Sequence, residues 1–132
     1  MNAGYSGTPL AKKIGIKSGH RVLLRHAPAG WRIPDLPPDV AIATDMPESA
    51  DVVLAFFREL ADLADEVPEL AAALRPGAML WIAWPRKAGG HVSDIAENDL
   101  RDLLLPVGVV DVKVAALDND WSGLKFVWRK RA

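Results

Sequence analysis

An unbroken apolar run, Ala78–Pro85, lies between Arg75-Pro76-Gly77 and the polar segment Arg86–Gly90. A strand that is covered on both faces reads as a continuous apolar run, whereas a strand covered on one face alternates apolar and polar residues. A buried helix can also give a short apolar run, but the flanking glycine and the closing proline leave only the length of a strand. The run therefore predicts a central strand of an α/β sheet.

Shorter apolar runs predict five further strands. They are Arg21–Arg25, Val40–Thr44, Ala50–Phe57, Val109–Leu117 and Trp121–Arg129. Helical spacing and end signals predict short helices between them. They are Thr8–Gly15, with Thr8 as its cap, Arg58–Asp65, Glu69–Leu74 and a helix that runs to Leu104. Pro68 is expected to separate the second helix from the third, and Asp94 and Glu97 have the spacing of a capping box for the last.

The order of these elements predicts an α/β fold with three layers. Strands that alternate with helices form a mostly parallel sheet with helices on both faces. The short turn at Asp118–Asp120 forces the last two strands to be antiparallel, so the chain ends in a C-terminal hairpin. At 132 residues, the chain is expected to form a single α/β domain over residues 1–132.

Composition narrows the functional classes. The chain has no cysteine, which removes disulfides and thiolate nucleophiles and fits a reducing cytosol. No apolar stretch approaches the ~20 residues that cross a bilayer, and no signal peptide is evident, so we expect a cytoplasmic protein without membrane association. The net charge of −1 disfavours nucleic acid as a partner, because phosphate binding needs a concentrated basic patch.

Three segments resemble the Rossmann-like core of S-adenosylmethionine-dependent methyltransferases, namely Gly19–Leu24, Ala50–Leu54 and Leu74–Leu80, together with the terminal hairpin. The resemblance implies a methyltransferase-like, three-layer sheet. The segments Tyr5–Lys13 and Trp121–Lys125 also make the chain similar to a small bacterial family, domain of unknown function family 3052, which has no activity to transfer.

The methyltransferase resemblance weakens at the cofactor loop. In that family the first strand leads into an acidic residue and a glycine-rich loop, which lets the backbone approach the cofactor. Here Leu24–Gly30 holds a single glycine, and Pro28 lacks a backbone N–H. Asp45 is a candidate for binding ribose hydroxyls, but it reads more simply as a turn residue. We therefore expect no cofactor.

Ligands of open α/β sheets bind outside the carboxyl ends of the strands. The side chains expected at this edge form the candidate ligand-binding set: His26, Trp31, Arg58, Trp84, Arg86, Lys87, Asp118 and Trp121. Each also has a structural interpretation: a hydrogen-bonded histidine, a solvated strand exit, an Asx-type turn, or tryptophans packed over the rim. The histidines lack the spacing of metal ligands, and the serines lack a nucleophile-elbow setting. We predict no metal and no catalytic residue.

The sequence thus favours an uncharacterised, non-catalytic α/β domain that binds a small ligand or a protein partner at this edge, with a homodimer as one form of partner. A divergent methyltransferase-like enzyme, with an unusual cofactor cradle around Gly30 and Trp31, is the first alternative. A nucleic-acid-associated factor is the second, and it would use Lys12, Lys13, Arg86, Lys87 and the Arg129–Arg131 tail.

Overall fold

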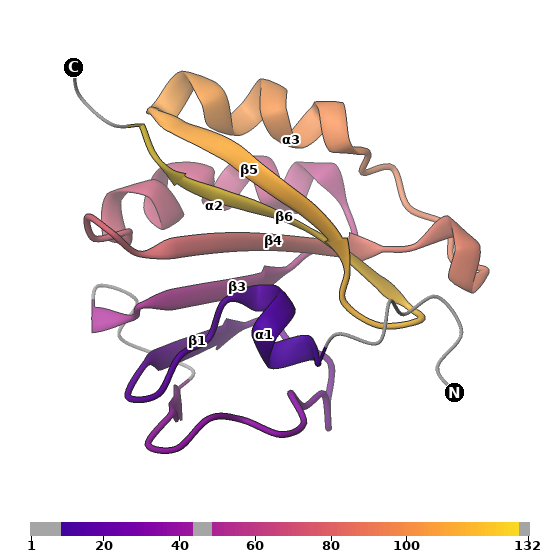
Figure 1. Ribbon diagram of the computed structural model, residues 1–132. Helices are drawn as coiled ribbons and strands as arrows, with labels where there is room; N and C mark the ends of the chain where they lie inside the picture. Colours follow the sequence, from indigo (N-terminus) through magenta and orange to yellow (C-terminus); the bar gives the residue numbers. More distant parts are fainter. Residues whose placement is uncertain (1–8, 44–48, 130–132) are drawn as a thin grey trace.

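Six strands form one mixed sheet (Figure 1). The computed structural model describes residues 9–43 and 49–129. The strands are β1 (Arg21–Arg25), β2 (Ala41–Ala43), β3 (Val52–Phe56), β4 (Met79–Pro85), β5 (Val109–Ala116) and β6 (Trp121–Trp128). The helices are α1 (Leu10–Ile14), α2 (Leu60–Ala73) and α3 (Glu97–Leu104), with short 3₁₀ turns η2 (Lys87–Gly89) and η3 (Leu105–Val107). Several residues of the sequence-based predictions lie outside the described ranges, namely Thr8, Thr44, Asp45, Lys130 and Arg131.

The predicted central strand, β4, lies in the middle of the sheet. The strand order is β2-β1-β3-β4-β6-β5, and β4 is parallel to β3 and antiparallel to β6. Every residue of β4 after Met79 is buried. Leu80 and Ile82 pack toward one face of the sheet, while Trp81 and Ala83 pack toward the other. The continuous apolar run therefore reflects burial on both faces, as predicted.

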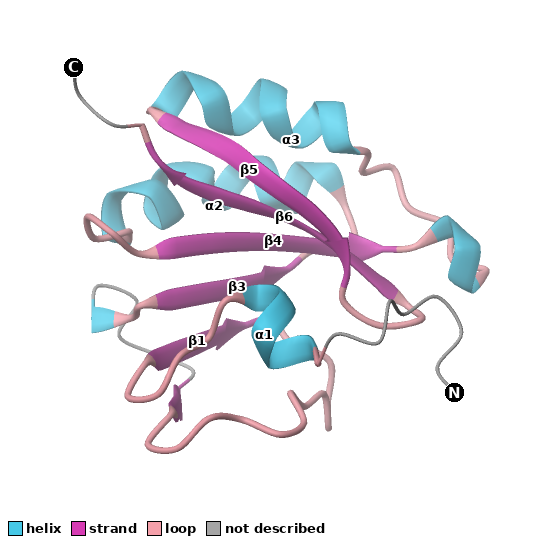
Figure 2. Ribbon diagram, in the orientation of Figure 1, coloured by secondary structure: helices cyan, strands magenta, loops and turns pink. Residues whose placement is uncertain are grey.

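Helices cover both faces of the sheet (Figure 2). Leu63 of α2 and Leu100 of α3 belong to the core on one face. Ile14 of α1 and Ile33, from the segment after β1, belong to the core on the other. The predicted three-layer, mostly parallel sheet with a C-terminal antiparallel hairpin is confirmed. None of the helices in the described ranges is long and apolar enough to span a membrane.

Helix α2 runs through Pro68 without interruption, so the prediction of two short helices was wrong. The buried side chains Leu63, Val67 and Leu70 form one stripe along the helix, on both sides of the proline. Pro68 itself is exposed, so its ring needs no room in the core. Burial of the continuous stripe outweighs the missing N–H, because tertiary packing supplies most of a helix's stability in proteins.

Replacing Pro68 with alanine is expected to raise the free energy of unfolding by about 2 kcal/mol. Alanine is about 3 kcal/mol more favourable than proline inside a helix, and the greater freedom of the unfolded chain offsets up to ~1 kcal/mol of that gain. Urea denaturation followed by circular dichroism measures the change. Pro34→Ala, at an exposed loop position, is the control and should not stabilise the protein. A less stable Pro68→Ala protein would contradict this account.

The start of α3 also differs from the prediction. The helix begins at Glu97, and the Asp99 carboxylate accepts the Ala96 backbone N–H at 3.0 Å. The Asp94 carboxylate instead accepts the backbone N–H of Leu60 at 2.8 Å, at the start of α2. The first N–H groups of any helix need acceptors, and a side chain from another segment can supply one. Asp94 therefore caps a different helix from the one its spacing suggested.

Candidate functional site

Two neighbouring clefts open at the carboxyl edge of the parallel strands. The first has a volume of about 470 Å³, and the second has a volume of about 380 Å³. Both are lined by Pro28, Arg58 and Trp121, so they form one continuous groove, which we call the edge groove. Volumes of this size are typical of small-molecule sites. Because β6 starts where β4 ends, Trp121 reaches the same edge as the residues that follow the parallel strands.

Aromatic side chains form the floor of the edge groove. The ring of Phe56 packs edge-to-face against Trp121, at 5.0 Å between centroids, and against Trp31, at 4.8 Å. The guanidinium carbon of Arg58 lies 5.0 Å from the centroid of the Trp121 ring. This is the geometry of a cation–π contact, and Arg58 is exposed. Arg58, Trp121 and Trp31 of the candidate set therefore meet in one place.

Asp118 holds the turn beside the groove together. Its Oδ1 atom accepts the backbone N–H groups of Asp120 and Trp121, each at 2.8 Å. Its Oδ2 atom accepts the indole N–H of Trp31 at 2.9 Å. The turn is thus of the Asx type expected from the sequence, and the second oxygen fixes Trp31 over the edge. The role of Asp118 in this arrangement is to position other groups.

Arg86 supports the same turn from the end of β4. One guanidinium N–H donates to the backbone carbonyl of Asp118 at 3.0 Å, and the backbone N–H of Arg86 donates to the carbonyl of Asp120 at 2.8 Å. Lys87 is exposed at the first position of η2 and is not a lining residue of either cleft. These two basic residues therefore do not form a shared cationic site with Arg58.

Trp84 lies in the core. Its side chain is only 8% exposed and packs with the α2 and α3 side chains, outside both clefts of the edge groove. The alternation along β4 explains this placement, because Trp84 shares a face with Leu80 and Ile82. The sequence placed Trp84 near the edge along the strand, but the side chain points between the sheet and its helices.

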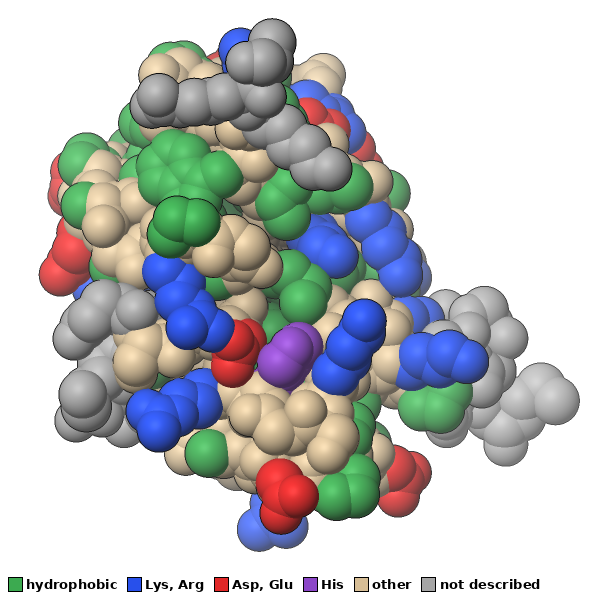
Figure 3. Space-filling view, turned by 60° about the vertical axis from the view of Figure 1, so that its left-hand side comes forward, with side chains coloured by type: hydrophobic (Ala, Val, Ile, Leu, Met, Phe, Trp, Pro, Cys, Tyr) green, Lys and Arg blue, Asp and Glu red, His purple; other side chains and the backbone are tan. Residues whose placement is uncertain are grey.

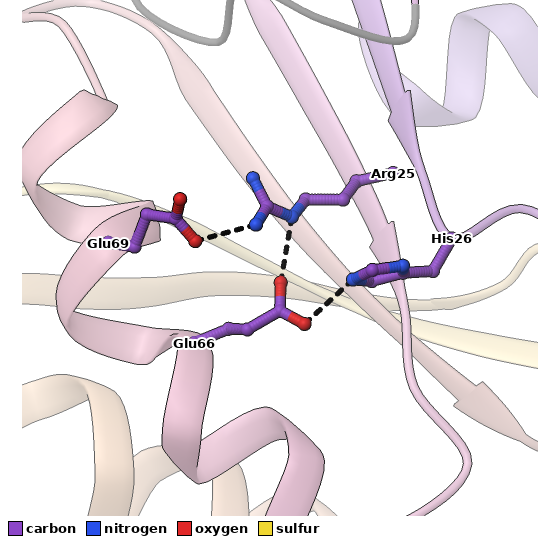
Figure 4. A network of polar contacts seen from close by, with 4 residues as sticks. All are labelled: Arg25, His26, Glu66 and Glu69. Carbon is purple, nitrogen blue, oxygen red and sulfur yellow. Dashed lines mark hydrogen bonds and ion pairs between the residues drawn. The ribbon is translucent and has the colours of Figure 1, made fainter.

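A polar network joins β1 to α2 on the other side of the groove (Figure 4). The Glu66 carboxylate contacts the Nε of Arg25 and the Nε2 of His26, both at 2.7 Å, and Glu69 contacts the same guanidinium at 2.6 Å. The His26 ring also packs edge-to-face against Phe57, at 5.5 Å between centroids. His26 is therefore held in place by a carboxylate and an aromatic ring.

His26 has a backbone φ of 60°, in the left-handed region that glycine adopts most readily. It directly follows β1, so the chain makes its sharp exit from the strand at a residue with a side chain. Such strain persists where the surroundings impose it, and functional sites are a common place for it. Glu66 and Phe57 supply those surroundings here.

Sequence reasoning missed the acidic side chains of the groove. Glu59, Asp62, Asp65 and Glu66 line the first cleft from the start and the exposed side of α2. Their spacing of three and four residues is typical of one helix face. The signal was present in the predicted helix Arg58–Asp65, but only the apolar side of that helix was considered. Within the described ranges, no three His, Asp or Glu side chains are placed to hold a metal ion.

The second cleft is bordered by another pair that the sequence did not predict. The Nε2 atom of His91 lies 2.8 Å from the Asp120 carboxylate. Next to this pair, Gly89 lies directly against the backbone of the turn between β5 and β6. A Cβ atom on Gly89 would lie 2.5 Å from the carbonyl oxygen of Asn119. Only glycine allows the loop after β4 to approach the turn this closely, so the loop closes one end of the groove.

The sheet order, the layers and the position of the groove define a Rossmann-like domain of the methyltransferase fold. A S-adenosylmethionine-dependent methyltransferase from Aquifex aeolicus is similar over 89% of this chain and 86% of its own, with a TM-score of 0.58 and 15% identity. The N-methyltransferase NodS from Bradyrhizobium japonicum is similar over 92% and 91%, with a TM-score of 0.56 and 14% identity. Identities this low show a common fold.

A third similar structure is the fibrillarin pre-rRNA processing protein of Methanococcus jannaschii, with a TM-score of 0.56 and 14% identity over 94% of this chain and 70% of its own. No curated protein matches the chain significantly. The family model described as "Protein of unknown function (DUF3052)" matches residues 33–130. The chain belongs to this family, as its resemblance suggested.

Proposed function

We propose that this domain binds a small ligand in the edge groove and does not catalyse a reaction on it. The observation that carries the proposal is the exposed Arg58 guanidinium over the Trp121 ring, at the point that both clefts share. A concave aromatic surface with a few convergent polar groups is the usual form of a ligand site. The cation–π pair presents hydrogen-bond donors to a ligand while the indole supports its apolar part.

The charges around the groove indicate the class of ligand. Arg58 and His26 lie at the exit of the strands, while Glu59 directly precedes α2 and Asp62 and Asp65 lie on it. Acidic side chains outnumber the arginine, and they favour a ligand with a positively charged group. Arg58 suits an acceptor such as a carboxylate. We infer a small amphoteric molecule with a flat or apolar body.

The hydrogen bonds around the groove support a binding role over a catalytic one. The Asp118 carboxylate already accepts three N–H groups, and the Nε2 of His26 is paired with Glu66. The described lining of the two clefts includes no Ser, Thr, Cys, Lys or Tyr side chain that could act as a nucleophile. The polar groups of the edge thus serve mainly to hold its shape.

A divergent methyltransferase-like enzyme is the alternative that a specific observation favours. His26 adopts a glycine-like conformation at the end of β1, where methyltransferases resembling this chain have glycines. A further cleft of about 500 Å³ adjoins it, lined by Leu24, Arg25, His26, Ala27 and Trp31. The single glycine of the loop and the lack of an N–H at Pro28 weigh against close contact between backbone and cofactor.

Titration of the ¹⁵N-labelled protein with S-adenosylmethionine, and separately with a panel of small amphoteric molecules, tests both functions. For a ligand of the edge groove, we expect amide shifts centred on His26, Arg58 and Trp121. Arg58→Gln should weaken binding about tenfold, the effect of losing one charge-assisted contact. Arg32→Gln is the matched control, because Arg32 is exposed nearby and is not a lining residue of either cleft.

The outcomes separate the two functions. Binding by a panel molecule, lost in Arg58→Gln and kept in Arg32→Gln, would support the proposed role. Binding of S-adenosylmethionine with shifts centred on Leu24–Ala27 would favour the enzyme instead. A third outcome is that no panel molecule binds and the protein forms a dimer through this edge. The occupant of the groove would then be a second copy of the chain, not a small ligand.

A further inference from the structure

Two lysines face each other on the side of the sheet that α1 covers. The register of β5 and β6 pairs Lys113 directly with Lys125. Like charges at directly opposite positions of a sheet destabilise it. A β-bulge between Asp111 and Lys113 shifts the register at this point, and it brings the two lysines into line.

The C-terminal end of α1 adds more lysines to the pair. The Lys113 ammonium donates to the backbone carbonyl of Lys13 at 3.0 Å, so the β5 side chain reaches across to the helix. The Lys125 Nζ atom lies 3.9 Å from the position that a Cβ on Gly15 would take. Lys17 follows Gly15 by two residues, and its charge lowers the pKa of Lys125. We call Lys17, Lys113 and Lys125 the lysine cluster.

The charges of the cluster affect one another. Partial burial lowers the pKa of Lys125, and the nearby charges of Lys113 and Lys17 lower it further. No ion pair within residues 9–43 and 49–129 includes a member of the cluster. Figure 3 shows one face of the molecule, on which several Lys and Arg side chains and one acidic side chain surround a histidine.

We propose that the lysine cluster binds a compact, multiply charged anion of the phosphate class, on the face of the sheet that α1 covers and outside the edge groove. Lys113 and Lys125 are cross-strand neighbours beside the end of α1, and each ammonium group offers N–H donors to an oxyanion. A bound anion neutralises the repulsion between Lys113 and Lys125. The site is independent of the ligand proposed for the edge groove.

The compactness of the cluster favours a small anion over nucleic acid. Proteins that bind duplex DNA neutralise several phosphates, about six to ten in well-studied cases, spread along the backbone. Here two of the three lysines are direct cross-strand neighbours, and Arg75 is paired with Asp51. The overall net charge of −1 gives little long-range attraction for a polyanion. A diphosphate-sized group suits a cluster of three lysines better than a long polyanion does.

Inorganic pyrophosphate, added to the full chain at constant ionic strength, is the probe for this site. We expect amide shifts at Lys17, Lys113 and Lys125, and a higher thermal midpoint. Lys125→Gln and Lys113→Gln should each weaken pyrophosphate binding about tenfold. Without pyrophosphate, Lys125→Gln should raise the thermal midpoint, because it removes the repulsion and keeps the hydrogen bond from Lys113 to the Lys13 carbonyl. Lys87→Gln removes the same charge outside the cluster, and it should leave pyrophosphate binding unchanged.

His20 gives an independent readout. Burial lowers its pKa, and the charges of Lys17 and Arg75 lower it further. Its Nδ1 atom accepts the backbone N–H of Lys17 at 3.0 Å. An anion held at Lys17 reduces that repulsion, so pyrophosphate should raise the pKa of His20, as followed by NMR. A merely screening salt at equal ionic strength should raise it less.

Three results would overturn the proposal. One is no response to millimolar pyrophosphate at constant ionic strength. Another is equal pyrophosphate affinity in the wild-type chain and in a Lys113→Gln protein whose circular dichroism spectrum is unchanged; Lys113 is exposed, so we expect this variant to fold. The third is that a single-stranded oligonucleotide binds more tightly than pyrophosphate, and that the salt dependence of its binding indicates more phosphate contacts than the cluster has lysines.

Discussion

Replacement of Trp81 by alanine is expected to lower the free energy of unfolding by about 4 kcal/mol, in the range measured for large aromatic side chains in cores. Trp81 is fully buried on the α1 face of β4. Its indole N–H donates to the carbonyl of Ile14 at 2.9 Å, at the end of α1. The substitution therefore opens a cavity and leaves a helix-terminal carbonyl without its donor.

The neighbouring strand shows how closely this side chain is packed. A Cβ on Gly123 would lie 2.9 Å from the Trp81 ring and 3.2 Å from Leu117, so β6 has a glycine where the indole passes. Cores relax only partly around a deleted side chain. Gly123 has no side chain that could move into the cavity left by the indole, so we expect most of that cavity to remain. Trp81→Phe, which keeps a ring but loses the N–H, should cost about 2 kcal/mol.

Urea denaturation measures these losses, with the tryptophan-independent signal of circular dichroism as the probe. Val92→Ala is the control, because Val92 is 98% exposed and its truncation should change stability by less than about 0.5 kcal/mol. If Trp81→Ala cost no more than the control, the indole would not hold α1 on the sheet. A cost for Trp81→Phe equal to that of Trp81→Ala would assign the whole effect to the hydrogen bond.

The strands were predictable from the sequence because the signal for them is local. The apolar run of β4, the turn at Asp118 and the apolar run of β3 all depend on residues close together in the chain. The topology followed from the order of elements, since crossover connections are right-handed and hairpins are antiparallel. From these local signals Arg58 and Trp121 were expected at the carboxyl edge, and both line the cleft there.

The fine structure of the site was less predictable, because its contacts join distant parts of the chain. Trp31 and Asp118 are 87 residues apart, and nothing in either segment specifies their hydrogen bond. The sequence also does not show how deeply a side chain at the end of a strand is buried. Trp84 was expected at the rim of the sheet, but it is buried under the helices. Helix α2 was divided at Pro68 because proline is a strong local signal, and tertiary burial overrode it.

Asp118→Ala is expected to lower the free energy of unfolding by about 3 kcal/mol, because three hydrogen bonds of about 1 kcal/mol each are lost. Two of them fix the turn between β5 and β6, and the third fixes the indole of Trp31. The variant should therefore loosen the wall of the edge groove as well as the hairpin. Asp120→Ala is the matched control. Its carboxylate is exposed and pairs with His91 at the surface, so we expect a change below about 1 kcal/mol.

Asp118→Asn separates the two roles of the carboxylate. The amide oxygen can still accept both backbone N–H groups of the turn, but its NH₂ group then faces the indole N–H of Trp31, donor against donor. The loss should be about 1 kcal/mol, and Trp31→Phe should cost about as much. The double variant should lose less than the sum, because both changes remove the same bond. Additive losses in this cycle would show that Asp118 does not hold Trp31 over the groove, and that the turn alone accounts for the effect of Asp118→Ala.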